Sequence, residues 1–221
     1  MLAAEAGNVE LVRALVARGA DTELVDNAGR NALHLALART AADPAYAARA
    51  LPGLWSLLAP TSVSLQLDEQ LVKIDAHLIE YVLFQLMYTL QRDHLFALYS
   101  WRRGMRSVHL LKVAERLPLA ALRADRRRRD YLNGVLARNE VGRNYPYNRR
   151  LFLRVAHGHY VLNPRLELRI GSRFTPVYDL IGVSRMAELG LDRYVAATRL
   201  LTAKLAQSED GRSAGAPGEA R

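Results

Sequence analysis

The chain has 221 residues, of which 50% are hydrophobic, and its 31 Lys and Arg against 22 Asp and Glu give a formal net charge of +9. It contains no cysteine, which excludes disulfide bonds and thiolate metal sites. Its most apolar stretch, near residues 81–90, is too short to cross a bilayer, and the first residues lack the pattern of a signal peptide. We therefore expect a cytoplasmic protein of one or two domains without a membrane partner. The Ala, Leu and Arg content is compatible with a bacterial source.

Residues 1–60 contain an internal repeat. Leu2-Ala3 aligns with Leu35-Ala36 at an offset of 33 residues. Between them, Gly7-Asn8 separates two short helical patterns, and the second has an apolar stripe with Gly19 at its end. Residues 3–21 and 26–36 resemble the ankyrin repeat, with a further outer helix expected near residues 51–58.

The ankyrin resemblance implies a protein partner. It places Asp26, Asn27 and Arg30 in the β-turn as the residues that contact this partner. It also implies that His34 binds backbone across the turn and does not catalyse. The array is shorter than the three repeats that usually bury a continuous core. We expect either the C-terminal end of a longer array or a stack that the following domain caps.

The next elements read as a helical core. Residues 61–74 are predicted to be a linker or an irregular hairpin. Asp75 is a suitable N-cap for a helix to about Leu90 that is apolar on nearly every side, which is typical of a buried helix. A shorter helix is predicted for residues 107–116.

The most basic run follows at Arg126, Arg127, Arg128 and Arg129, between Asp125 and Asp130. Because apolar residues recur at positions 132, 135 and 136, the pattern predicts an amphipathic helix with a basic first half. In such a helix Asp125 would pair with Arg129, and Arg126 with Asp130.

The pattern then changes to a period of two. Residues 151–155 alternate, His157-Gly158 supplies a tight turn, and residues 159–162 return as the second arm of a hairpin. Residues 166–170 also alternate and could add a third strand or pack alongside. His157 and His159 lack a third metal ligand at a useful spacing. Tyr145 and Tyr147 are expected to pack in the core or form a turn, with stacking on unpaired bases as the alternative.

The order helix, helix, basic helix and hairpin resembles a winged helix-turn-helix domain over residues 75–171. That family places its third helix in the DNA major groove and its wing on the backbone or minor groove. By resemblance these parts would be residues 126–139 and 149–159. The candidate nucleic-acid contacts are Arg126, Arg127, Arg128, Arg129, Arg138, Arg143, Arg149, Arg150 and Arg154.

Charge agrees with a polyanionic partner for this segment. Residues 101–171 hold 17 basic and 5 acidic side chains, a net charge of +12, whereas residues 1–100 carry −4 and residues 172–221 carry +1. Localised positive charge of this kind favours nucleic acid. The alternative is a solvated, partly self-neutralised surface.

The C-terminal part is predicted to contain a helical segment, residues 172–207, and a disordered tail, residues 208–221. The chain shows no Gly-rich phosphate loop, nucleophile elbow or paired catalytic carboxylates. We expect no enzyme activity, no cofactor, no metal and no small-molecule substrate.

The predicted fold is mainly α, with ankyrin helix-turn-helix repeats joined to a winged-helix-like α+β domain that has a small β-hairpin wing. The predicted function is binding, with a protein partner at residues 1–60 and nucleic acid at the basic domain. The alternative is a protein-interaction scaffold in which the winged domain only caps the ankyrin stack or dimerises.

Overall fold

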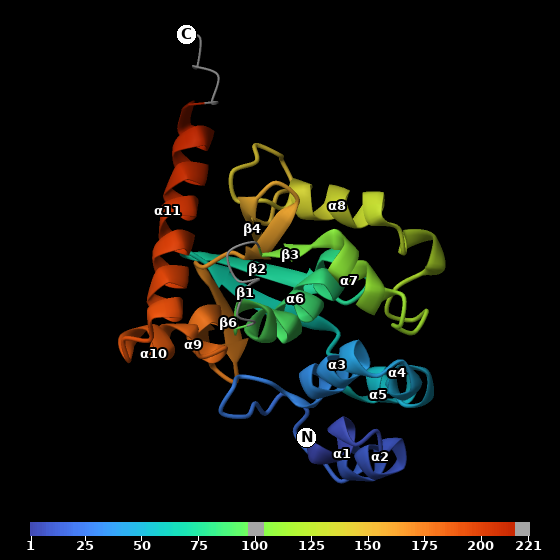
Figure 1. Ribbon diagram of the computed structural model, residues 1–221. Coiled ribbons are helices and arrows are strands. Elements are labelled where there is room, and N and C mark those ends of the chain that lie inside the picture. The colour runs from blue at the N-terminus through green and yellow to red at the C-terminus, as the bar shows by residue number, and fades with distance from the viewer. Residues whose placement is uncertain (97–103, 215–221) are drawn as a thin grey trace.

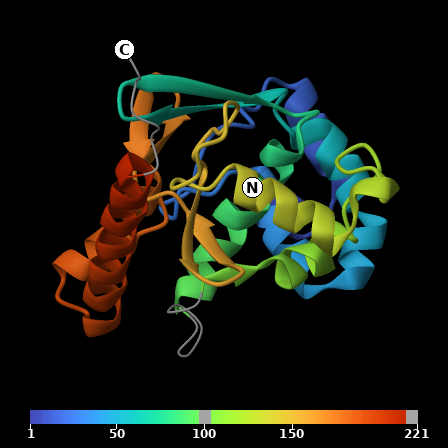
Figure 2. The ribbon, with the colours of Figure 1, turned by 90° about the horizontal axis from the view of Figure 1, so that it is seen from above.

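The computed structural model describes residues 1–96 and 104–214. Five N-terminal helices form one end of the molecule, two small antiparallel sheets and the helix α6 (Ile79–Phe96) form its centre, and the long helix α11 (Asp192–Ala214) stands along one side (Figure 1). Seen from above, the hairpin that follows the N-terminal helices extends across the molecule to the sheet strands near α11 (Figure 2). Elements from both halves of the chain therefore meet around the centre.

The N-terminal end consists of paired helices, as the repeat predicted. The helices are α1 (Leu2–Glu5), α2 (Val9–Ala17), α3 (Ala32–Ala42), α4 (Pro44–Arg49) and α5 (Leu51–Leu58). Asn8 caps α2 by accepting a hydrogen bond from the backbone N–H of Leu11 at 3.0 Å. Gly19 follows α2 with φ +83°, the left-handed conformation predicted for it.

The residues between α3 and the outer helix α5 form the short helix α4. Asp43 caps this helix by accepting hydrogen bonds from the N–H groups of Ala45 and Tyr46, and Pro44 occupies its first turn. The ring of Tyr46 is buried, and its hydroxyl donates to the carbonyl of Ala4. Helix α4 therefore joins α1 to the second repeat.

The segment given above as a linker or hairpin is a hairpin. Strands β1 (Ser62–Leu67) and β2 (Gln70–Asp75) pair around a turn at Asp68, and β1 also pairs with β6 (Leu166–Ile170). With β7 (Arg173–Pro176) they make a four-stranded sheet in the order β2-β1-β6-β7. The predicted boundaries at residues 74 and 171 therefore divide strands of one sheet.

A second sheet lies beside three helices. The elements in chain order are α6, β3 (Met105–Arg106), α7 (Ser107–Ala114), a short 3-10 helix η2 (Ala124–Arg126), α8 (Arg129–Arg138), β4 (Phe152–Ala156) and β5 (His159–Leu162). The predicted hairpin is β4–β5, and the sheet order is β3-β5-β4.

Residues 166–170, which the sequence offered as a possible third strand, pair with β1 and β7 in the other sheet. That pairing buries Leu166 and Leu168 in the core. The third strand of the second sheet is β3. A two-residue strand such as β3 is too short to show any periodicity in the sequence.

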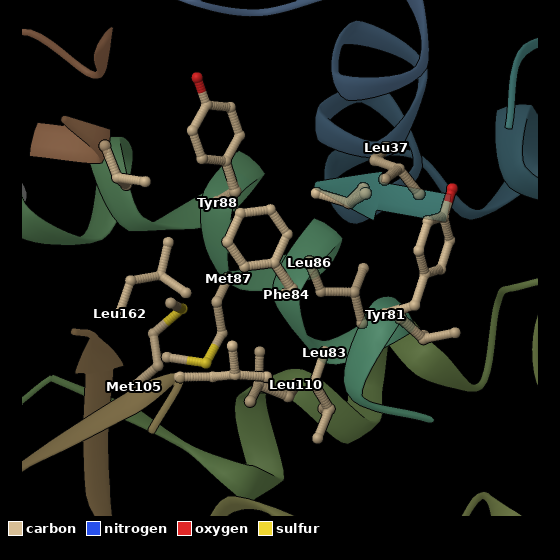
Figure 3. Packing of buried hydrophobic residues seen from close by; sticks show 14 of the residues in the cluster. Leu37, Tyr81, Leu83, Phe84, Leu86, Met87, Tyr88, Met105, Leu110 and Leu162 are labelled. Carbon is tan, nitrogen blue, oxygen red and sulfur yellow. The ribbon is translucent and has the colours of Figure 1, made fainter. Parts of the chain in front are cut away.

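The apolar helix α6 is the centre of the hydrophobic core, as its sequence predicted (Figure 3). Residues 81–88 are all buried, and α6 packs against α3, α7, β2, β3 and β5. It begins at Ile79, not directly after Asp75, because β2 extends to Asp75. The buried hydrophobic residues form one connected cluster, whose members range from Ala4 to Leu205, so both halves of the chain share one core.

Polar contacts join the ankyrin segment to α6. The His34 ring accepts a hydrogen bond from the N–H of Asn31 at Nδ1, so Nε2 carries the proton that is donated to Gln85 Oε1 at 2.8 Å. The Tyr88 hydroxyl donates to the carbonyl of Gly29 at 2.7 Å. The expected contact of His34 with backbone is thus present, and its second nitrogen ties the repeat to the next domain.

The C-terminal part adds α9 (Val177–Leu180), α10 (Val183–Glu188) and α11. The helix predicted for this region is longer than expected, since it continues to Ala214 through residues predicted to be disordered; residues 215–221 lie outside the described part. Leu201 and Leu205 are buried and anchor α11. Once a helix is nucleated by packing, each added residue gains one backbone hydrogen bond, which extends it past the last apolar contact.

We predict that Gly29→Ala destabilises the protein by about 1–3 kcal/mol more than Gly19→Ala, because its added methyl group would overpack the interface. Both glycines have positive φ, so both substitutions share the backbone penalty. Only at Gly29 would the new Cβ meet other atoms, at 2.7 Å from the Tyr88 hydroxyl and 2.9 Å from the Leu180 carbonyl oxygen; at Gly19 nothing lies within 4 Å. Urea unfolding of both variants measures the difference, and equal losses would contradict the close packing of the turn on α6.

A second prediction concerns pH. Burial lowers the pKa of His34 to about 4, so the folded protein keeps this ring neutral while the unfolded chain takes up a proton below about 6.5. Stability should therefore fall as pH drops from 7 toward 4, with about 2 kcal/mol lost at pH 5 through this group. Urea unfolding of the wild type and of His34→Gln at both pH values tests this. Between pH 7 and pH 5, the free energy of unfolding of the variant should fall by correspondingly less than that of the wild type. If both fall equally, His34 is not the source of the pH dependence.

Candidate functional site

The basic run does not form the first half of a helix. Arg126 ends the 3-10 helix η2, Arg127 and Arg128 continue in non-helical conformations, and α8 begins only at Arg129. Arg127 donates hydrogen bonds to the carbonyls of Leu122, Glu115 and Leu117 at 2.8–3.1 Å. This arginine therefore folds the connection between α7 and α8 and is committed to the protein's own backbone.

The ion pairs expected around the run are also different. Asp125 pairs with Arg123 at 3.1 Å, and Asp130 lies 4.0 Å from Arg128. The predicted pairs, Asp125 with Arg129 and Arg126 with Asp130, required helical spacing, which is absent before Arg129. Both observed pairs are exposed and contribute little to stability.

The apolar side of α8 agrees with the prediction. Leu132, Val135 and Leu136 are buried, whereas Arg129 and Arg138 are exposed at opposite ends of the helix. No acidic side chain in the described parts of the chain pairs with either arginine. The helix therefore presents a positive residue at each end of its outer face.

The connection from α8 to β4 is held by two asparagines. Asn139 is buried and accepts a hydrogen bond from the N–H of Arg149 at 3.2 Å. Asn148 donates to the carbonyls of Glu140 and Arg143 at 2.7 and 2.8 Å. Residues 139–150, which we call the α8–β4 loop, are thus fixed to the end of α8.

Buried carboxylates hold part of the predicted arginine set. Glu140 accepts a hydrogen bond from Arg154 at 2.6 Å and lies 3.7 Å from Arg143, and Arg154 also lies over the ring of Tyr160. Burial disfavours the charge of Arg154, but the hydrogen bond and charge of Glu140 outweigh it and raise the pKa of Arg154.

Arg149 and Arg150 differ from each other in their surroundings. Arg149 lies 3.7 Å from Glu80 of α6 and is partly shielded. Arg150 has φ +51°, a conformation that non-glycine residues rarely adopt. Its backbone is held on both sides, by Asn148 at the N–H and by Asn163 at the carbonyl.

The nine candidate arginines therefore divide into two groups. Arg127, Arg149 and Arg154 contact backbone carbonyls or shielded carboxylates. The remaining six are exposed or half-buried and can still reach a partner; they are Arg126, Arg128, Arg129, Arg138, Arg143 and Arg150. Two of these six lie near a carboxylate, Arg128 at 4.0 Å from Asp130 and Arg143 at 3.7 Å from Glu140, but their side chains remain 64% and 56% exposed. Arg102 and Arg103, which contributed to the charge of the predicted basic segment, lie outside the described residues.

The β4–β5 turn adds little charge to this surface. His159 Nδ1 contacts the carbonyl oxygen of His157 at 2.7 Å, so this imidazole is engaged by the turn itself. Within residues 1–96 and 104–214, no three His, Asp or Glu side chains gather as a metal site would require. The hairpin itself carries a single arginine, Arg154, which is already paired.

The ankyrin turn holds Asp26, Asn27 and Arg30. Asp26 accepts hydrogen bonds from the N–H groups of Ala28 and Arg30 and from the Arg30 guanidinium at 3.0 Å. Partial burial opposes ionisation of Asp26, but the backbone hydrogen bonds and the Arg30 charge lower its pKa overall. Asp26 and Arg30 therefore brace the turn, while Asn27 is exposed and free to meet a partner.

A polar cleft of about 660 Å³ lies where the ankyrin segment meets the four-stranded sheet. Residues 20–25 form one wall, and the separating ends of β1 and β6 form the other. His34 and Gln85 also line it, but they are already bonded to each other. His34 and Gln85 therefore provide the cleft with no free nucleophile or acid–base pair.

The sequence identified the candidate arginines but not the residues that determine which of them are paired within the protein. Glu80, Asn139, Glu140 and Asn148 come from α6 and from the α8–β4 loop, and they decide which arginines are paired. Glu80 lies 59 positions from Asn139 and 69 positions from Arg149 in the sequence. A periodicity signal cannot report contacts at that separation; the Asn-rich loop was the only local hint.

Comparison with known proteins identifies the N-terminal segment. Residues 1–43 match the family described as ankyrin repeats (many copies). No curated protein and no solved structure matches the chain. Among the described residues, no helix has the length and apolar character needed to cross a membrane. The N-terminal segment thus consists of ankyrin repeats, which supports a role in protein–protein interaction.

We predict that Arg127→Ala lowers the free energy of unfolding by about 2 kcal/mol, because three carbonyls lose charged donors. Arg126→Ala, one residue earlier and without such contacts, should change it by less than about 0.5 kcal/mol. Chemical denaturation of the two variants makes the comparison. Similar small effects would mean that the hydrogen bonds of Arg127 are replaced by water at no cost.

Proposed function

We propose that this chain is a non-catalytic binding protein. Its ankyrin segment contacts a protein partner, and residues 75–171 act as a winged-helix-like domain that contacts nucleic acid with little sequence preference. The observation that carries the second part is the placement of six available arginines on and around α8, at the end of the molecule away from α1 and α2 (Figure 1).

The winged-helix assignment is supported by topology. The order is α6, β3, α7, α8, β4, β5, and β3 pairs with β5, which pairs with β4. This order is similar to that of a winged helix-turn-helix, with a short strand before α7 completing the hairpin's sheet. In this arrangement α8 takes the place of the helix that enters the major groove.

Charge supports contact with phosphates. Guanidinium groups bind phosphate oxygens through paired N–H donors. The carboxylates nearest to the α8–β4 loop, Glu80 and Glu140, are shielded and paired, so they do little to weaken its positive potential. Because the hairpin turn offers no free arginine, we place the main contact on α8 and the loops at its two ends.

The alternative function is a scaffold in which the second domain caps the ankyrin stack. Contacts between the two parts favour it: Arg116 donates to the carbonyls of Thr40 and Ala41 at the end of α3, and α6 holds His34 and Gly29. Helix α8 is exposed in either case, but only the nucleic-acid function predicts that it binds a duplex. One binding measurement therefore distinguishes the two functions.

Salt dependence is that measurement. Binding of a labelled duplex is followed by fluorescence anisotropy across a salt series, for the wild type and for Arg129→Ala/Arg138→Ala. Each lost phosphate contact should reduce the slope of log K against log salt by about 0.9, so the double variant should lose about 2 in slope. Both residues are exposed on a helix that tolerates alanine, so the fold should be kept.

The matched control removes the same charge from the other end of the molecule. Arg13→Ala/Arg18→Ala on and beside α2 should leave both affinity and slope unchanged. Equal effects of the two double variants would indicate an unspecific charge effect. If the wild type binds neither a duplex nor a single strand at low salt, the nucleic-acid function is rejected and the scaffold remains.

A further inference from the structure

Two tyrosines stand exposed on the α8–β4 loop. Tyr145 and Tyr147 are 42% and 76% exposed, and their rings lie 6.0 Å apart with an interplanar angle of 71°. The sequence favoured core packing or a simple turn for this pair, and the structure places them in a turn with both rings outward. Among the other tyrosines whose side chains are described, all are buried or half-buried.

These rings add little to the stability of the fold. Burial of apolar area is the main gain from an aromatic side chain, and Tyr147 forgoes most of it. Large aromatic side chains gathered on the surface mark a contact with a partner more often than a structural need.

Hydrogen bonds hold the backbone of the loop that carries the two rings. The N–H of Asn148 donates to the carbonyl of Tyr145 at 3.0 Å and closes the turn that contains Tyr147. The side chain of Asn148 binds the carbonyls of Glu140 and Arg143, which joins the turn to the end of α8. A partner that contacts the rings therefore meets a loop with a fixed backbone, and little backbone conformational entropy is lost on binding.

Positive charge surrounds the pair in the chain. Arg143 precedes it, Arg149 and Arg150 follow it, and Arg138 ends the helix to which the loop is fixed. The one carboxylate in the loop, Glu140, is only 11% exposed; it is paired with Arg154 at 2.6 Å and lies 3.7 Å from Arg143, whose side chain stays 56% exposed. Exposed aromatic rings and arginines that are neighbours in the chain suit a ligand in which flat bases alternate with phosphates.

We infer that the α8–β4 loop binds unpaired nucleotides, with Tyr145 and Tyr147 stacking on bases and Arg138, Arg143 and Arg150 contacting the adjoining phosphates. A duplex does not fit the rings in this way, because its base faces are covered by their neighbours in the stack. Single strands expose those faces, and every base offers one. The inference rests on the proposed nucleic-acid function and specifies its ligand. That ligand is a single-stranded segment, alone or beside a duplex held by α8.

The test measures binding of three labelled probes by anisotropy: oligo(dT), an abasic strand of equal length and charge, and a duplex. The variants are Tyr145→Ala/Tyr147→Ala and Tyr145→Phe/Tyr147→Phe, with Leu71→Ala, also highly exposed but in the β1–β2 hairpin, as the control. Thermal melting checks that each variant is folded.

The alanine variant should bind oligo(dT) at least about tenfold more weakly, whereas the phenylalanine variant should stay within about threefold of the wild type. Duplex and abasic binding should not respond to either change. The wild type should prefer oligo(dT) to the abasic strand, and the alanine variant should lose that preference. Leu71→Ala should match the wild type on all three probes.

Other outcomes overturn the inference. If the alanine variant binds oligo(dT) as the wild type does while salt-sensitive duplex binding persists, the rings make no stacking contact and the proposed function stands alone. If the phenylalanine variant loses as much as the alanine variant, the hydroxyl groups act and stacking is rejected. If the wild type binds no nucleic acid at low salt, both proposals fail and the two rings belong to a protein interface.

Discussion

The rest of the structure depends on the need to bury α6 on all sides. A helix with buried residues at every position from 81 to 88 has no face to offer to water, so it must be enclosed by other elements. The ankyrin helix α3, α7, β2, β3 and β5 supply that enclosure, and they come from both halves of the chain. Two of its buried amide side chains find partners inside the core: Gln85 Oε1 accepts a hydrogen bond from His34, and Gln91 Oε1 accepts one from the N–H of Leu162 at 2.8 Å. One helix thereby joins the repeats and the second domain into a single core.

This enclosure also decides where partners can bind. The ankyrin turn that contains Gly29 rests on Tyr88, so the side of the repeats facing α6 is closed. What remains open at that end is the outer part of the turn, where Asn27 is exposed, and the surface of α1 and α2. At the opposite end, α8 contacts α7 with its apolar side and leaves its basic ends free (Figure 1). The two binding surfaces that we propose therefore lie apart, so that a protein and a nucleic acid would not compete for one site.

The arginines show how one residue type serves both folding and binding. Where a guanidinium group reaches several backbone carbonyls, as Arg127 does, its donors are used within the protein, and its removal would leave acceptors unmet. Where a shielded carboxylate lies nearby, as for Arg154, the pair is worth more than an exposed one because water screens it less. Arg129 and Arg138 have neither kind of partner among the described residues. Net charge alone did not separate these cases, because it counts each arginine equally.

By itself the sequence determined the local elements: the ankyrin repeats, which leave a signature at a 33-residue offset, the apolar helix α6, the apolar side of α8 and the hairpin β4–β5. These depend on periodicity and turn chemistry within short windows. The tertiary structure alone decided the rest. Residues 62–75 form a hairpin that becomes part of a larger sheet, because β6, about 100 positions later, pairs with β1 and buries Leu166 and Leu168. Three of the four arginines of the basic run precede α8, with Arg127 bound to backbone carbonyls, and Tyr145 and Tyr147 lie exposed on a loop that Asn148 fixes to the end of α8. Each of these outcomes depends on contacts between distant residues or on competition for hydrogen bonds, which no local pattern records.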